Sequence, residues 1–281
     1  MPVELEKVRS LFDRPEKTGD SQFMRREVAS RMDERLSLVR IDPSYILDAG
    51  CGYSADTLLL AKRFDGAHMI GLDMSWPVLV KAQQEKSGSV TGFVCGNFAV
   101  LPLEANSIDL IWSNLALHWH PAPIEVFREW NRVLKPNGLL MFSCFGSGTF
   151  EELKKSFSNI DSYSHVHSFA DMIPLGDGLV EAGFTEPVLE REWIDVTYKD
   201  VEKLLSDVRA FGGNAMSGRR MGLFGKNEYE KLLKSLEKSR DGNGNLSLGF
   251  EIIVAHAFKK DSSLPAGEKV MQFYGRNYPE N

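Results

Sequence analysis

Residues 47–52 read Leu47-Asp48-Ala49-Gly50-Cys51-Gly52, and they close a short apolar run that begins at Tyr45. An apolar run that ends in glycines is typical of a buried strand followed by a tight turn into a helix. Glycines let the backbone approach a ligand closely, and a following helix exposes free amides at its N-terminus. We therefore expect a ligand site at the end of this strand.

Strand and helix signals alternate on both sides of this glycine turn. Strands are predicted at 45–49, 67–73, 90–95, 108–113 and 139–145, and helices at 56–64, 75–85 and 123–134, with a turn over 135–138. The strands are continuous apolar runs, as expected when helices cover both faces of a sheet. The fold class is therefore α/β, with a doubly wound, mostly parallel sheet.

The remaining segments organise the chain around this sheet. Residues 1–42 are predicted to form an N-terminal helical extension, and residues 43–260 the main domain. The stretch 199–247 is too long for a connection within a compact sheet, so we interpret it as an inserted helical lid before a last strand at 250–258. Residues 261–281 are predicted to be a C-terminal tail.

Composition excludes several classes of protein. The 281 residues are 43% hydrophobic and 26% charged, and a net charge of −6 gives no general attraction to nucleic acid or anionic membrane. No uncharged apolar run is long enough for a membrane helix. Three widely spaced cysteines argue against a disulfide framework and favour the cytoplasm, and no histidine pair has a matching metal-ligand constellation.

Two acids suggest which ligand the turn binds. Gly50, Gly52 and Ala55 formally satisfy the dinucleotide pattern, so a nicotinamide enzyme is one alternative. Asp48, however, lies badly for a pyrophosphate and suits the ammonium group of S-adenosylmethionine. Asp73 follows 25 residues later, where a carboxylate can accept both ribose hydroxyls; the alternative is that it only caps the next helix.

Further polar residues follow the later strands. Asn97 is placed to hydrogen-bond an adenine amino group and Phe98 to pack on the ring, although both can also be ordinary loop residues. Asn114 falls where the methionine portion would lie. The predicted cofactor-binding residues are Asp48, Gly50, Cys51, Gly52, Asp73, Met74, Asn97, Phe98 and Asn114.

These motifs together resemble the class I S-adenosylmethionine-dependent methyltransferases. The segments that carry the resemblance are 47–52, 71–75, Leu101-Pro102-Leu103 with Ile108-Asp109-Leu110, and Arg132-Val133-Leu134-Lys135-Pro136-Asn137-Gly138. The resemblance implies a Rossmann-like sheet of seven strands with the last one antiparallel. Members usually have a third glycine where this chain has Tyr53-Ser54. Ser54 should fit if its backbone avoids positive φ.

Segments outside the cofactor motifs resemble the malonyl-acyl-carrier-protein O-methyltransferases of biotin synthesis. They include Phe12-Asp13-Arg14, Ser113-Asn114-Leu115-Ala116-Leu117-His118-Trp119 and Arg219-Arg220-Met221-Gly222-Leu223-Phe224-Gly225-Lys226. The resemblance implies methyl transfer to the free carboxylate of malonyl-acyl carrier protein or malonyl-CoA. A respiratory-complex assembly factor of the arginine-hydroxylase type and a noncatalytic binding module remain alternatives.

The acceptor site is expected to hold a cation and residues after the fourth strand. His118 and Trp119 are placed to face the substrate, and Arg25, Arg26, Arg219 and Arg220 are the candidates for orienting a carboxylate. Residues 209–240 contain eight Lys or Arg and three acids, a local net charge of +5. This excess indicates a docking surface for an acidic carrier protein, or else a solvated helix face.

Overall fold

The computed structural model describes residues 3–14, 22–84, 90–158, 160–161, 163, 165–211, 215–216 and 225–261. Within them, seven strands form one sheet in the order β3-β2-β1-β4-β5-β7-β6, with β7 antiparallel to both of its neighbours. The strands are β1 Tyr45–Ala49, β2 His68–Asp73, β3 Val90–Cys95, β4 Ile108–Ser113, β5 Leu134–Phe145, β6 Phe184–Tyr198 and β7 Leu246–Lys259. The predicted α/β class and the antiparallel last strand are confirmed.

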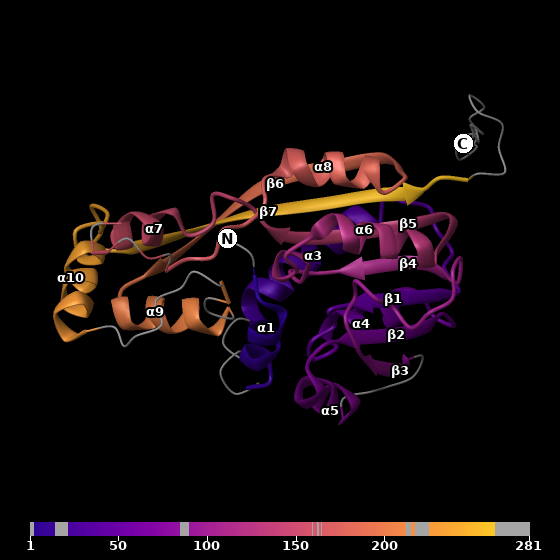
Figure 1. Ribbon diagram of the computed structural model, residues 1–281, viewed down its shortest axis with the longest axis horizontal. Helices are drawn as coiled ribbons and strands as arrows, with labels where there is room; N and C mark the ends of the chain where they lie inside the picture. The colour runs from indigo at the N-terminus through magenta and orange to yellow at the C-terminus, as the bar shows by residue number, and fades with distance from the viewer. Residues whose placement is uncertain are drawn as a thin grey trace, which may run out of the picture.

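Helices cover both faces of this sheet (Figure 1). They are α1 Leu5–Phe12, α3 Gln22–Leu36, α4 Ala55–Arg63, α5 Trp76–Gln84, η2 Leu117–Trp119, α6 Pro123–Val133, α7 Glu151–Ser158, α8 Met172–Glu181, α9 Val201–Ala210 and α10 Lys226–Glu237. Side chains of β1 alternate between two apolar cores: Ile46 joins one with α3, α4, α9 and α10, and Leu47 joins the other with α6 and α8. Both faces of the strand are therefore buried among apolar side chains, which explains the continuous apolar strands.

The strand order reverses between β1 and β4: the chain adds β2 and β3 on one side of β1, then crosses over to β4 on the other side. In a doubly wound sheet, ligands bind beyond the carboxyl ends of the strands at such a reversal. Figure 1 shows α1 lying at this end of the sheet, between the strands and α9. The position of the glycine turn after β1 therefore places it at the expected site.

The N-terminal helices are part of the packed structure. In α3, Met24, Val28, Met32 and Leu36 are fully buried and belong to the core that also contains residues of α9 and α10. Apolar side chains at these helical spacings form one stripe, which the sheet covers. Both α1 and α3 lie within the helical extension predicted for residues 1–42, whereas no helix was predicted at α7.

Two boundaries differ from the sequence prediction. Residues 135–138, predicted as a separate turn, form a bulge inside β5, because the pairing with β4 jumps from Ile108↔Leu134 to Leu110↔Leu139. The last strand, predicted at 250–258, begins earlier, at Leu246. It pairs with β6, which starts at Phe184 directly after Gly183 ends α8 with φ of 92°. No helix in the described part of the chain is long and apolar enough to cross a membrane.

Candidate active site

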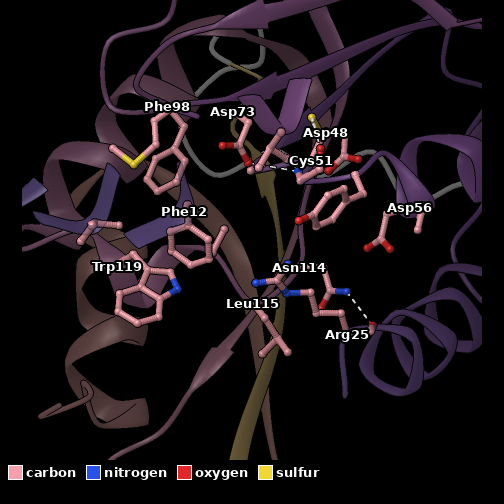
Figure 2. A pocket seen from close by; sticks show the side chains of 18 of the residues that line it. Phe12, Arg25, Asp48, Cys51, Asp56, Asp73, Phe98, Asn114, Leu115 and Trp119 are labelled. Carbon is pink, nitrogen blue, oxygen red and sulfur yellow. Dashed lines mark hydrogen bonds between the residues drawn. The ribbon is translucent and has the colours of Figure 1, made fainter. Parts of the chain in front are cut away.

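A pocket with an empty volume of about 1000 Å³, including its mouth, lies at the carboxyl ends of β1, β2, β3 and β4. The N-terminal helices α1 and α3 close its other side (Figure 2). All nine residues predicted to bind the cofactor line this pocket: Asp48, Gly50, Cys51, Gly52, Asp73, Met74, Asn97, Phe98 and Asn114. Residues that the sequence spreads over 67 positions are therefore brought to one cavity.

The glycine turn needs its glycines for two separate reasons. Gly50 has φ of 87°, and a Cβ on it would lie 2.5 Å from the Cβ of Ala116. Gly52 has φ of 53°, a left-handed conformation that glycine adopts without a steric penalty. Ser54 also has positive φ, 65°, so the condition under which a serine was expected to fit here is not met. The fold imposes a glycine-like conformation on a serine there.

Asp73 is fixed by backbone amides on both carboxylate oxygens. Its Oδ2 accepts a hydrogen bond from Gly52 N at 3.0 Å, and its Oδ1 accepts one from Ser75 N at 2.9 Å. Burial raises the pKa of Asp73, while these amide bonds oppose that shift. The carboxylate therefore caps the next turn. Each oxygen keeps a second lone pair, so it can still accept a hydrogen bond from a ribose hydroxyl.

Asp48 and a second acid lie on the opposite side of the turn. Asp48 is buried, and its Oδ2 accepts a hydrogen bond from Thr57 Oγ1 at 2.6 Å. Burial raises the pKa of Asp48 well above its usual range, and the nearby charge of Asp56 adds to this shift. Asp56 lines the pocket and was missed by the sequence analysis, although an acid in the first turn after a glycine motif is a visible signal.

The segment after β3, which was predicted to contact the adenine, forms another part of the pocket wall. Asn97 Oδ1 accepts a hydrogen bond from Ala99 N at 2.9 Å, so the amide oxygen shapes the turn and the amide nitrogen is left as the donor. Phe98 packs its ring 5.8 Å from that of Trp130 while also lining the pocket. An apolar wall with one amide is a suitable surface for a purine ring.

Asn114 lines the pocket, but both polar atoms of its side-chain amide form hydrogen bonds within the protein. Its Nδ2 donates to the Arg25 carbonyl oxygen at 2.9 Å, and its Oδ1 accepts from Ser143 Oγ at 2.8 Å. Asn114 therefore connects the end of β4 to α3. Figure 2 shows the Arg25 side chain extending into the pocket beside Asn114.

The predicted acceptor residues are separated by the fold. Trp119 and Arg26 line the pocket, and the edge of the Phe12 ring meets Trp119 with centroids 5.4 Å apart. His118 lies outside the lining of this pocket and is buried against Phe145, whose backbone N donates to His118 Nδ1 at 3.4 Å. Arg219 and Arg220 lie outside the described residues.

The helix α1 covers the mouth of the pocket. Ser75 Oγ donates to Asp13 Oδ1 at 2.9 Å and to the Phe12 carbonyl at 3.2 Å, which ties the end of α1 to the turn after β2. At its start, Glu4 N donates to the Ala215 carbonyl at 3.1 Å. These contacts hold the apolar side chains of Leu5, Val8 and Phe12 in the wall of the pocket.

These residues fit S-adenosylmethionine. Asp73 presents hydrogen-bond acceptors for the ribose, and Phe98 with Met74 provides an apolar wall. Asp48 and Asp56 are acids that would attract the cationic end of the cofactor. A sheet of this order with such a pocket defines a class I S-adenosylmethionine-dependent methyltransferase. In keeping with this, residues 47–142 match the family model of the methyltransferase domain.

Curated relatives narrow the class. Malonyl-(acyl-carrier protein) O-methyltransferase of Gallionella capsiferriformans is 39% identical, over 92% of this chain and 91% of the relative. The protein of the same name from a Methylovorus species is also 39% identical, over 98% of this chain and 96% of the relative. The chain belongs to the malonyl-(acyl-carrier protein) O-methyltransferase family, and it is an S-adenosylmethionine-dependent enzyme.

Solved structures share the fold at low identity. The YcgJ protein of Bacillus subtilis is similar with a TM-score of 0.59 and 14% identity, over 86% of this chain and 99% of that chain. A Haemonchus contortus phosphoethanolamine N-methyltransferase, solved with S-adenosylhomocysteine, is similar with a TM-score of 0.56 and 18% identity. That match covers 90% of this chain and 60% of the other. At these identities the likeness supports the fold alone.

Proposed function

We propose that this protein transfers the methyl group of S-adenosylmethionine to the free carboxylate of malonyl-acyl carrier protein, in the synthesis of the biotin precursor. The observation that carries the proposal is a pocket lined by Asp48, Asp56 and Asp73 in a chain that matches curated relatives of that name over more than nine tenths of its length. The arginine-hydroxylase alternative has no comparable support among these relatives.

The proposed chemistry needs little from the protein beyond positioning. When bound, S-adenosylmethionine supplies an electrophilic methyl group on a sulfonium sulfur. The malonyl carboxyl is ionised at neutral pH, so its oxygen attacks without a general base. Asp73 and the glycine turn hold the donor, while Phe12 and Trp119 keep water out, and the rate then depends on in-line alignment.

On the acceptor side, we assign Trp119 and Arg26 to the wall that faces the malonyl group. Both line the pocket, and the exposed position of Arg26 suits an acid that arrives from solvent. His118 lies behind Trp119, and its Nε2 is buried without a hydrogen-bond partner among the described residues. We assign His118 to positioning Trp119, and we retain Arg219 and Arg220 as candidate carboxylate ligands in the lid.

The proposed partner is an acidic carrier protein, and α10 offers a surface for it. Lys226, Lys231, Lys234 and Lys238 are all exposed on or next to this helix. Long lysine side chains on one helix attract an acidic partner and accelerate its encounter. Cys51, Cys95 and Cys144 are free thiols, which favours our placing the reaction in the reducing cytoplasm.

The direct test is transfer of a labelled methyl group to purified malonyl-acyl carrier protein, with the unmalonylated carrier protein as the control. We expect a labelled methyl ester that mild alkaline hydrolysis releases as methanol. Absence of the ester under conditions in which the protein binds S-adenosylmethionine would refute the proposal. Rescue of a biotin auxotroph that lacks its own methyltransferase tests substrate and pathway together.

A further inference from the structure

Arg25 is a cation inside the pocket that the activity described above does not yet use. It belongs to α3, is half-buried, and extends its side chain toward the glycine turn (Figure 2). A Cβ built on Gly52 would lie 3.8 Å from Arg25 Nη1, so the guanidinium lies directly over this glycine. The Phe12 ring lies on another side, with its centroid 5.8 Å from Arg25 Cζ.

The guanidinium of Arg25 has no hydrogen-bond or ion-pair partner among the residues that the structure describes. The nearby carboxylates of Asp73 and Asp56 act on it only through space. Other arginines of the chain are paired with acids: Arg31, Arg35, Arg63, Arg128, Arg132 and Arg240. A half-buried guanidinium without a hydrogen-bonded partner loses part of its hydration uncompensated, so its position in this pocket points to an anion supplied by a ligand.

The backbone of Arg25 is held in place from the opposite side of the pocket. Asn114 donates to its carbonyl oxygen, and Asn114 is itself fixed by Ser143 Oγ. Burial lowers the pKa of Arg25, while Asp73, Tyr53 and Asp56 oppose that shift. A guanidinium is not deprotonated in proteins, so Arg25 is a cation. The result is a preorganised cation, which loses little entropy when it binds a carboxylate.

We propose that Arg25 binds the carboxylate of the methionine portion of S-adenosylmethionine. The inference rests on that cofactor. Asp73 and Phe98 line the pocket, and Asp73 accepts a hydrogen bond from Gly52 N. With the ribose on Asp73 and the adenine at Phe98, as predicted above, the methionine end would extend across the glycine turn toward Gly52. The only carboxylate of the cofactor is at that end, and a guanidinium is the geometric match for it.

A guanidinium could also bind the malonyl carboxylate. The position of Arg25 favours the carboxylate of the cofactor over that of the malonyl group. Arg25 lies over Gly52, which is hydrogen-bonded to Asp73. Its neighbour Arg26 also lines the pocket but is the exposed member of the pair. We therefore assign the inner arginine to the cofactor and the outer one to the acceptor.

The test is calorimetric titration of the wild-type protein and of Arg25→Gln with three ligands. S-adenosylmethionine carries the carboxylate, decarboxylated S-adenosylmethionine lacks only that group, and methylthioadenosine lacks the whole amino-acid portion. We expect Arg25→Gln to weaken the binding of S-adenosylmethionine by about 10- to 100-fold. The affinities for the other two ligands should stay within about twofold of those of the wild type. Arg25→Lys should recover part of the loss, because it restores the charge without the planar fork.

Arg26→Gln is the matched control, and we expect it to leave the affinity for all three ligands unchanged. Equal weakening of the three ligands by Arg25→Gln, or no weakening at all, would overturn the assignment. Unchanged cofactor affinity together with a raised KM for the malonyl thioester would also overturn it, because Arg25 would then serve the acceptor. Failure of the wild-type protein to bind S-adenosylmethionine would instead refute the cofactor itself. Near-native circular dichroism verifies that each variant is folded.

Discussion

Trp112 Nε1 donates a hydrogen bond to Asp56 Oδ2 at 2.9 Å. The bond joins the fully buried indole of β4 to the first turn of α4, and it holds a carboxylate at the rim of the cofactor pocket. Burial raises the pKa of Asp56, whereas the bonds from Trp112 and Asn114 and the charge of Arg25 lower it. Asp56 is thus a buried carboxylate that specific hydrogen-bond donors stabilise. Buried acids with a shifted pKa are typical of ligand sites.

Asp56→Asn is expected to weaken S-adenosylmethionine by about 10-fold, because one negative charge near the cationic end of the ligand is removed from a partly buried site. The amide oxygen can still accept from Trp112, so the fold should be retained. Calorimetry measures the affinity, with Asp65→Asn as the control, since Asp65 is exposed on the loop between α4 and β2. Unchanged affinity for Asp56→Asn would show that this carboxylate only supports the indole.

Ser54→Gly is expected to stabilise the protein by about 1 kcal/mol, because a left-handed conformation is unfavourable for a residue with a Cβ. Ser54 is also fully buried, with no hydrogen-bond partner for its Oγ among the described residues. Urea unfolding measures the difference. Ser54→Ala is the matched control: it removes the unpaired hydroxyl and keeps the Cβ, so it should recover only part of the gain. A loss of stability in Ser54→Gly would contradict this account.

The stabilisation that the cofactor provides should increase with pH. Burial is the largest cause of the raised pKa of Asp48, Asp56 and Asp73. A raised pKa in the folded state means that these groups favour folding below the ordinary aspartate pKa, about 3.9, and lose that contribution as pH rises through the raised values. A ligand with net positive charge compensates for the ionised carboxylates, so its binding should strengthen over the same range.

Thermal unfolding with and without S-adenosylmethionine, between about pH 5 and pH 7.5 at constant ionic strength, measures this effect. The increase in Tm should grow with pH. Methylthioadenosine, which is uncharged, should show a much smaller slope. A Tm increase that stays constant or falls with pH for S-adenosylmethionine would mean that the three acids do not respond to the ligand charge.

Phe12→Ala should speed the release of the cofactor and weaken its binding by about 3- to 10-fold. The substitution removes the edge contact of the Phe12 ring with Trp119 and its contact with Arg25. Water can then enter the pocket beside α1. Stopped-flow measurement of S-adenosylhomocysteine release gives the rate. Leu11→Ala is the control, because Leu11 packs in the same helix without lining the pocket. Equal effects of the two variants would indicate general loosening of α1.

Much of the fold could be predicted because its signals are local. The apolar runs of β1 and β4 and the glycines at 50 and 52 specify strands and a turn by short-range rules, and the nine cofactor residues follow from their places after strands. The extent of β6 and the bulge at 135–138 depend on pairing partners far away in the sequence. Strand pairing is set by tertiary packing, which composition does not encode.

The sequence by itself determined the glycine turn, the acids at Asp48 and Asp73, and hence the class of ligand, because these depend on spacing along single elements. Only the tertiary structure distinguished Arg25 from Arg26, which both line the pocket. Adjacent residues on a helix point about 100° apart, and the packing of α3 on the sheet leaves Arg25 half-buried and Arg26 exposed. The tertiary structure likewise places His118 against Phe145, outside the pocket lining, and Trp112 within hydrogen-bond distance of Asp56. Contacts across 56 positions of sequence follow from how β4 and α4 pack, and from nothing that either segment contains alone.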